Sequence, residues 1–262
     1  MKGTPANEKL FWDSRARNYP LPFDPATAAK TSRIVRLLGR MGVNFKGQRL
    51  LDIGCGTGVY ALPLASAASC VLGADSSRAM LAVFRRQCRE RGIKNASCVL
   101  AAWGELPRAA VKGKFDLALA SMTMAVKNRA DVLKMESAAG RCVYIGWDGV
   151  RKNELLEAVY RAHGLEYKAP EGAPRLLRIL RALGRGFSVR RIRDSWEKVS
   201  TPAEALREIA INMKVNGAKL KRGEVEKLLA RRTRNGKVRQ RTTVLKALIT
   251  WRSPKKAAKK VL

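Results

Sequence analysis

Histidine, paired cysteines and long apolar runs are scarce in this sequence of 262 residues, and each shortage excludes a class of protein. A single histidine, His163, is too few for a histidine-rich metal site, so we predict no metal. The five cysteines are odd in number and lack Cys-x-x-Cys spacing, which indicates reduced cysteines in a cytoplasmic protein. No run of about 18 apolar residues and no apolar stretch near Met1 occurs, so we expect neither a membrane span nor a secretory signal.

Acidic residues are also few, because 21 Asp and Glu stand against 53 Lys and Arg. The resulting net charge of +32 is uneven: residues 1–150 carry 23 basic and 11 acidic residues, and residues 151–262 carry 30 and 10. Such a balance favours a polyanionic partner, either nucleic acid or an anionic substrate. Basic side chains scattered over solvated helix faces would give the same composition. Both interpretations stay open from the sequence, and nucleic acid is the less favoured partner.

Among the residues that are present, one short stretch organises the chain. Leu50, Leu51 and Ile53 form the brief apolar run of a buried parallel strand, and glycines follow at positions 54, 56 and 58. The apolar pattern then resumes as a helix. Glycines let the backbone turn sharply and approach a ligand, and the first N–H groups of the helix lack partners within it. This strand, turn and helix unit is therefore a candidate ligand site.

The spacing excludes the dinucleotide motif G-x-G-x-x-G, since its third glycine would fall at Val59. The pattern Asp52-x-Gly54-x-Gly56-x-Gly58 resembles motif I of the class I S-adenosylmethionine-dependent methyltransferases. In that family an acidic residue at the end of the next strand binds the ribose hydroxyls of the cofactor. The next strand here ends in Asp75, which is 21 positions after Gly54 (75 − 54).

The resemblance implies S-adenosylmethionine as the cofactor and supplies a candidate binding set. The third strand lacks the acidic residue that holds adenine in the family and has Ala102 there, followed by Trp103. Adenine would then be held by backbone groups or by stacking on Trp103, although a core tryptophan is an equal alternative. The candidate cofactor residues are Asp52, Gly54, Cys55, Gly56, Gly58, Asp75, Ser76, Ala102, Trp103 and Ser121.

The order of the predicted elements gives the fold class. Five units of a strand and a helix come first, and a strand, a helix and a last strand follow. This order resembles the seven-stranded sheet of the methyltransferases. The predicted fold class is therefore α/β, a doubly wound and mostly parallel sheet with the last strand antiparallel and helices on both faces. We expect a single domain over residues 1–262. It comprises an N-terminal cap and helix (1–45), a catalytic core (46–252) with helical insertions at 170–185 and 201–237, and a basic tail (253–262).

The substrate and the catalytic residues are harder to read. Methyl transfer needs alignment and exclusion of water more than a base, so no catalytic residue is assigned. His163 stands in the last turn of a helix before Gly164, where a dipole partner is commoner than a general base. The resemblance implies a methyltransferase, and we expect a small-molecule acceptor. The alternatives are an RNA-directed enzyme that uses the basic C-terminal third and a cofactor-binding regulator without activity. The sequence does not fix the oligomeric state.

Overall fold

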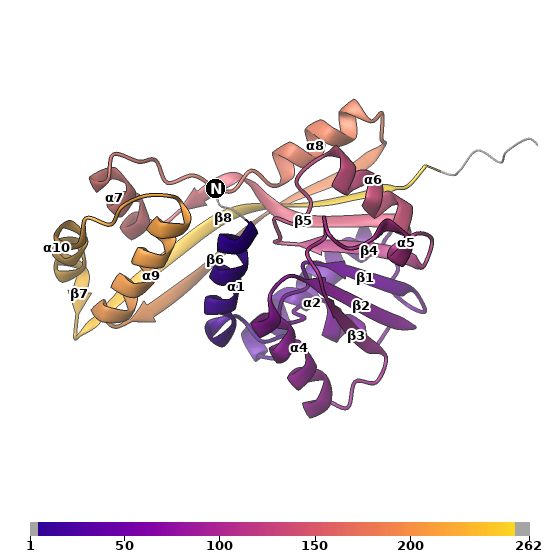
Figure 1. Ribbon diagram of the computed structural model, residues 1–262, viewed down its shortest axis with the longest axis horizontal. Helices are drawn as coiled ribbons and strands as arrows, with labels where there is room; N and C mark the ends of the chain where they lie inside the picture. The colour runs from indigo at the N-terminus through magenta and orange to yellow at the C-terminus, as the bar shows by residue number, and fades with distance from the viewer. Residues whose placement is uncertain (1–4, 255–262) are drawn as a thin grey trace, which may run out of the picture. The chain divides into compact units, whose positions relative to one another are not determined.

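The protein is described here from a computed structural model that covers residues 5–254, so residues 255–262 of the predicted basic tail lie outside it (Figure 1). Four strands come first in the chain: β1 Arg49–Ile53, β2 Cys70–Asp75, β3 Ala96–Leu100 and β4 Phe115–Ser121. Three long strands and one short one follow: β5 Ala139–Lys152, β6 Phe187–Ser200, β7 Thr233–Arg234 and β8 Lys237–Arg252.

The strands lie in the order β3-β2-β1-β4-β5-β8-β6, with β7 paired to β8. Strands β1 to β5 pair in parallel, so that Ile53 stands beside Ala74 on one side and Ala120 on the other. The predicted doubly wound, mostly parallel α/β sheet with an antiparallel last strand is confirmed. Two details differ from the prediction: β5, β6 and β8 continue for several residues beyond their apolar cores, and β7 is an additional strand.

Helices fill the connections between the strands. A capping box begins α9 as predicted, since the Thr201 hydroxyl accepts from the Glu204 amide and the Glu204 carboxylate accepts from the Thr201 amide. Among residues 5–254, no helix has both the length and the apolar character needed to cross a bilayer. The helices are α1 Pro5–Arg15, the 3₁₀ turn η1 Ala16–Asn18, α2 Pro25–Arg40, α3 Ala61–Leu64, α4 Arg78–Glu90, α5 Arg108–Val111, α6 Arg129–Ala138, α7 Glu154–Ala162, α8 Ala173–Ala182, α9 Pro202–Val215 and α10 Arg222–Arg232.

Both faces of the parallel sheet are covered. Leu51 and Ile53 point to one face, where they pack in a core with residues of α6 and α8. Leu50 points to the opposite face and is also buried. A strand that is buried on both faces needs a nearly continuous apolar sequence, which explains why β1 shows no alternation.

The contacts divide the chain into two compact units, where the sequence indicated one domain. The loop unit comprises residues 12–146, 173–190 and those from 247 onward, and it contains the glycine stretch. The basic unit comprises the residues up to 11 together with 147–172 and 191–246. Strands β5, β6 and β8 each contribute residues to both units.

The basic unit has a hydrophobic core of its own. Helices α7, α9 and α10 gather at β6 and β8 (Figure 1), and their buried side chains include Val159, Ile209 and Leu229. A tight turn joins β7 to β8, with Asn235 and Gly236 at φ of 50° and 70°. Asn-Gly with two positive φ angles is the preferred two-residue hairpin loop. The insertion predicted at 201–237 therefore helps to form a second packed core.

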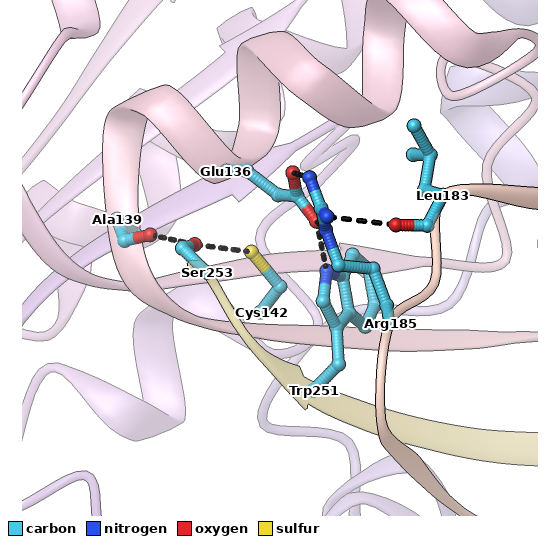
Figure 2. A network of polar contacts seen from close by, with 7 residues as sticks. All are labelled: Glu136, Ala139, Cys142, Leu183, Arg185, Trp251 and Ser253. Atoms are coloured by element: carbon cyan, nitrogen blue, oxygen red, sulfur yellow. Dashed lines mark hydrogen bonds and ion pairs between the residues drawn. The ribbon is translucent and has the colours of Figure 1, made fainter. Parts of the chain in front are cut away.

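A buried polar network ties three distant segments of the loop unit together (Figure 2). The Glu136 carboxylate, on α6, accepts from Arg185 Nε at 2.9 Å, from Arg185 Nη2 at 3.0 Å and from the indole N–H of Trp251 at 3.1 Å. A second contact nearby joins the Ser253 hydroxyl to the carbonyl of Ala139. This network fixes the end of β8 and the segment after α8 against α6.

Candidate functional site

The glycine turn lies between β1 and α3, at the carboxyl end of the parallel strands. Gly54, Gly56 and Gly58 have φ of 68°, 55° and 88°, the left-handed region that side chains disfavour. A β-carbon at Gly54 would come within 2.2 Å of Thr123 Oγ1, and one at Gly58 within 2.7 Å of Leu62. At Gly56 the nearest atom would be 3.8 Å away, on the Tyr19 ring. Gly54 and Gly58 are thus required by internal packing, whereas a β-carbon at Gly56 would meet only ordinary van der Waals contacts, with Tyr19 and Met80.

Asp75 ends β2 and closes onto this turn. Its Oδ2 accepts from the Gly56 amide at 2.8 Å, and its Oδ1 accepts from the Ser77 amide at 2.8 Å. Burial raises the pKa of Asp75, and the amide hydrogen bonds from Ser77 and Gly56 oppose that shift. The carboxylate and the glycine turn that the sequence pairs by spacing therefore meet directly.

Asp52, on β1, lies behind the turn and is buried. Burial, with a smaller contribution from the charge of Asp75, raises its pKa to about 7, although a hydrogen bond from the Ala61 amide opposes the shift. Its Oδ1 is buried and has no hydrogen-bond partner within residues 5–254. Two carboxyl groups thus share one edge of the sheet, and one of them carries an unsatisfied polar atom.

The N-terminal segment lies over the same edge, and its hydrogen bonds to Ser77, Ala79 and Thr57 hold it there. Asp13 Oδ1 accepts from the Ser77 hydroxyl at 2.6 Å and from the Ala79 amide at 3.1 Å, at the beginning of α4. Thr57 donates to the carbonyl of Pro20 at 2.8 Å. The sequence around Trp12 and Asp13 is recognisably aromatic. The hydrogen bond from the Ser77 hydroxyl to Asp13, 64 positions away along the chain, cannot be inferred from one sequence.

Comparison with known proteins finds similarity in the segment that holds this geometry and in the fold. Residues 50–143 match a family model described as a methyltransferase domain. The YcgJ protein of Bacillus subtilis superimposes with a TM-score of 0.53 at 15% identity, over 83% of this chain and 97% of that chain. Residues 50–143 are therefore similar to a methyltransferase domain, and the fold is similar to that of the solved structure.

Two curated relatives are named ubiquinone biosynthesis O-methyltransferase. The one from Dinoroseobacter shibae is 44% identical over 50 residues, 19% of this chain and 20% of the relative. The one from Sinorhizobium medicae is 34% identical over 89 residues, 32% of this chain and 36% of the relative. The matched part of this chain therefore spans about a third or less of the length of these relatives.

The remaining candidate residues occupy the neighbouring strand ends. Cys55 is buried against Gly73, and Ser76 is half-buried beside Ser77, which caps α4. Ser121 ends β4 with a buried hydroxyl that has no partner among the described residues. The next residue, Met122, has φ of 50°. A left-handed methionine is strained, and such strain gathers at functional sites. The sequence carried no indication of it.

Trp103 lies in the core of the loop unit, not on the wall of the site. Its side chain is 3% exposed, its indole N–H donates to the carbonyl of Asp131 at 3.3 Å, and Lys134 Nζ lies 4.4 Å from its ring centre. This placement corrects the suggested stacking on adenine in favour of the core alternative. Ala102, just before it, is half-buried at the site edge.

His163 has a structural role in the basic unit. Its Nε2 accepts from the Lys221 amide at 2.8 Å, and its Nδ1 lies 2.7 Å from the carbonyl of Val159. Both ring nitrogens are therefore engaged with the backbone. Within residues 5–254, no group of three or more His, Cys, Asp or Glu is arranged to hold a metal ion.

Asp52 makes a pH-dependent contribution to stability that can be measured. Because its folded pKa of about 7 exceeds the ordinary value of 3.8, folding favours the protonated form. The stabilisation is complete below about pH 4 and is lost as the pH rises through 7, with an upper bound of about 4 kcal/mol. We expect Asp52→Asn to flatten the fall in unfolding free energy between about pH 4 and 8, as measured by chemical denaturation without cofactor.

The control for this experiment is Asp116→Asn. Hydrogen bonds from Arg49 lower the pKa of Asp116, so folding favours its ionised form. The pH dependence of its contribution to stability is therefore opposite to that of Asp52, and the contribution is lost as the pH falls. If the Asp52→Asn profile ran parallel to that of the unsubstituted protein, Asp52 would be ionised in the fold.

The glycines offer a test that separates folding from ligand binding. Gly58→Ala places a methyl group 2.7 Å from Leu62 and 2.8 Å from Phe84 in a left-handed conformation, and should cost about 2 to 5 kcal/mol of stability. Gly56→Ala meets no such contact, so about 1 to 2 kcal/mol is expected. Thermal and chemical unfolding of both variants checks the order, and equal losses would contradict the packing role of Gly58.

Proposed function

We propose that this protein transfers the methyl group of S-adenosylmethionine to a small-molecule acceptor. The observation that carries the proposal is the contact between Asp75 and the glycine turn, with Oδ2 accepting from the Gly56 amide at 2.8 Å. That contact fixes a carboxylate beside Gly56, at the carboxyl end of the strands where open α/β sheets bind ligands.

The residues present fit the cofactor. A carboxylate offers about four acceptor positions, and Asp75 uses one on each oxygen for backbone amides, so each oxygen can accept from a ribose hydroxyl. Gly56 presents no side chain toward the ligand, and a β-carbon there would lie 3.8 Å from the Tyr19 ring and 4.0 Å from the Met80 sulfur. The unsatisfied Oδ1 of Asp52 and the hydroxyl of Ser121 remain as further polar groups at the same edge.

The chain itself would contribute binding and alignment to the transfer. When bound, the cofactor supplies an electrophilic methyl group on a positively charged sulfur. The glycine turn and Asp75 hold one end of the site, and the segment from Trp12 to Pro20 lies against the turn through Thr57 and Ser77. Alignment and exclusion of water are what a displacement at methyl requires. We assign no general base.

Two observations support a small acceptor that receives the methyl group on oxygen. The curated relatives are named O-methyltransferases, although they align with this chain over a limited length. In this chain the fourth strand ends in Ser121, and Met122-Thr123-Met124 follow. Enzymes of the resembled family that methylate amino groups of bases carry Asn or Asp followed by Pro-Pro-Tyr at this point, and this chain does not. The five cysteines are all free, which agrees with action in the cytoplasm.

Incubation with methyl-labelled cofactor and fractionated cell extract tests the proposal. Label should enter the small-molecule fraction with the intact protein and be lost with Asp75→Ala. Label in RNA instead would favour the RNA-directed alternative, and label in protein would also overturn the small-molecule acceptor. Binding of cofactor without transfer to any fraction would favour a regulator.

A further inference from the structure

The sheet of the basic unit has one face packed against helices. Successive side chains of a strand alternate between faces, and Val238 of β8 is buried in the core that α7, α9 and α10 share. Thr242 accepts from the Asn153 side chain at 2.8 Å, and Lys246 pairs with Asp194 at 2.6 Å. The even-numbered residues of β8 therefore face the helices.

From Lys237 to Arg241 the odd-numbered residues of β8 lie on the opposite face, which is open to solvent there. Lys237, Arg239 and Arg241 are exposed in alternation with these covered residues. Arg239 pairs with Glu197 of β6 at 2.8 Å, which places the odd-numbered residues of β6 on the same face. Arg191 in turn pairs with Asp148 of β5. This open face comprises Asp148, Val150, Lys152, Arg191, Arg193, Glu197, Val199, Lys237, Arg239 and Arg241.

Charge on the open face is strongly positive. Six of its side chains are cationic and two are acidic, and the two acids are paired with Arg191 and Arg239. The other four cations have no carboxylate partner within residues 5–254. Near the hairpin the excess continues, since seven of the 15 residues from 227 to 241 are Lys or Arg and none is acidic. Unpaired cations on a flat face are available to an external anion.

The arrangement of these cations fits a phosphate backbone. Alternate residues of a strand are about 7 Å apart, so Lys237, Arg239 and Arg241 form a regular row. Arginine, which predominates on the face, binds phosphate through two parallel hydrogen bonds. Val150 and Val199, at 41% and 49% exposure, add apolar surface that unstacked bases can contact.

We propose that the open face of the basic unit binds single-stranded RNA. A duplex groove is read by a protruding helix or ribbon, whereas a broad sheet face suits an extended single strand. The binding is electrostatic in origin. The bound RNA is not the acceptor of the methyl group, which is the small molecule of the proposed function.

The test uses the full chain and a labelled single-stranded RNA of about 20 nucleotides, with fluorescence anisotropy at salt concentrations of about 50 to 200 mM. The triple variant Arg193→Gln, Lys237→Gln and Arg241→Gln removes three unpaired, exposed cations. The slope of log affinity against log salt should then fall by about 2, and the affinity near 150 mM salt should drop by more than about tenfold.

The matched control is Arg33→Gln, Arg36→Gln and Arg40→Gln, three exposed cations of α2 in the loop unit. It changes the net charge equally and should leave RNA affinity within about twofold. Circular dichroism checks that both variants are folded. The proposal would be overturned if both variants lost RNA affinity equally, or if the unsubstituted protein showed no measurable RNA binding. Tighter binding of an acidic protein than of RNA would also overturn it.

Discussion

Asp75→Ala should weaken the binding of S-adenosylmethionine by about a hundredfold to ten-thousandfold, as measured by isothermal titration calorimetry. The substitution removes the acceptor for two ribose hydroxyls, and hydrogen bonds to a charged group contribute about 1.5 to 3 kcal/mol each. It also removes the acceptor for the Gly56 amide, so the turn loses the contact that fixes it. Both effects lower affinity.

Two further variants separate these effects. Asp75→Asn keeps an oxygen for one backbone amide and loses the charge, so an intermediate affinity is expected. Asp116→Asn removes a carboxylate near the beginning of β4, at the other end of the strand from Ser121, and should leave the affinity unchanged. Unchanged affinity in Asp75→Ala, with the fold intact by circular dichroism, would exclude Asp75 as the ribose ligand.

The sequence predicted the features of the fold that rest on local chemistry. The apolar run at Leu50 to Ile53, the glycines after it and Asp75 at the end of the next strand were sufficient to place one edge of the sheet. The capping box at Thr201 was also readable, because all its atoms lie within four residues. Patterns of this kind depend on backbone geometry and not on distant partners.

The roles of individual glycines could not be predicted in this way. Gly54 and Gly58 look alike in sequence, yet one is needed because Thr123 lies against it and the other because Leu62 and Phe84 do. Thr123 and Phe84 are far away along the chain. Trp103 was ambiguous for the same reason, since only the packing around Lys134 and Asp131 makes it a core residue.

The separate core of the basic unit was not predicted, because the charged portions of its strands look weak in the sequence. The odd-numbered positions 191, 193, 237, 239 and 241 carry Arg or Lys on the exposed face, so the apolar pattern is too short to show strands of 14 and 16 residues. That pattern is typical of an antiparallel sheet with one open face. The same feature that hid the strands produces the cationic surface.

Glu136→Ala should destabilise the fold by about 3 to 5 kcal/mol in chemical denaturation, because it leaves the partly buried guanidinium of Arg185 and the buried indole N–H of Trp251 without their acceptor. The Glu136 side chain is 5% exposed and that of Arg185 is 20% exposed. The same carboxylate raises the pKa of Arg185 through its hydrogen bonds, and it accepts from the buried indole of Trp251 (Figure 2). One substitution therefore affects three segments that are separated by 49 and 115 positions.

The exposed pair Arg222–Glu226 provides the control. Its side chains are 73% and 50% exposed, so Glu226→Ala should change stability by less than about 1 kcal/mol. In a double-mutant cycle, Arg185→Ala should cost about 1 to 3 kcal/mol less in the Glu136→Ala background than alone, since the pair can be broken only once. Additive losses would show that Glu136 acts through Trp251 and not through Arg185. A small loss in Glu136→Ala itself would mean that water reaches this site, and the end of β8 would then be held to α6 by apolar packing alone.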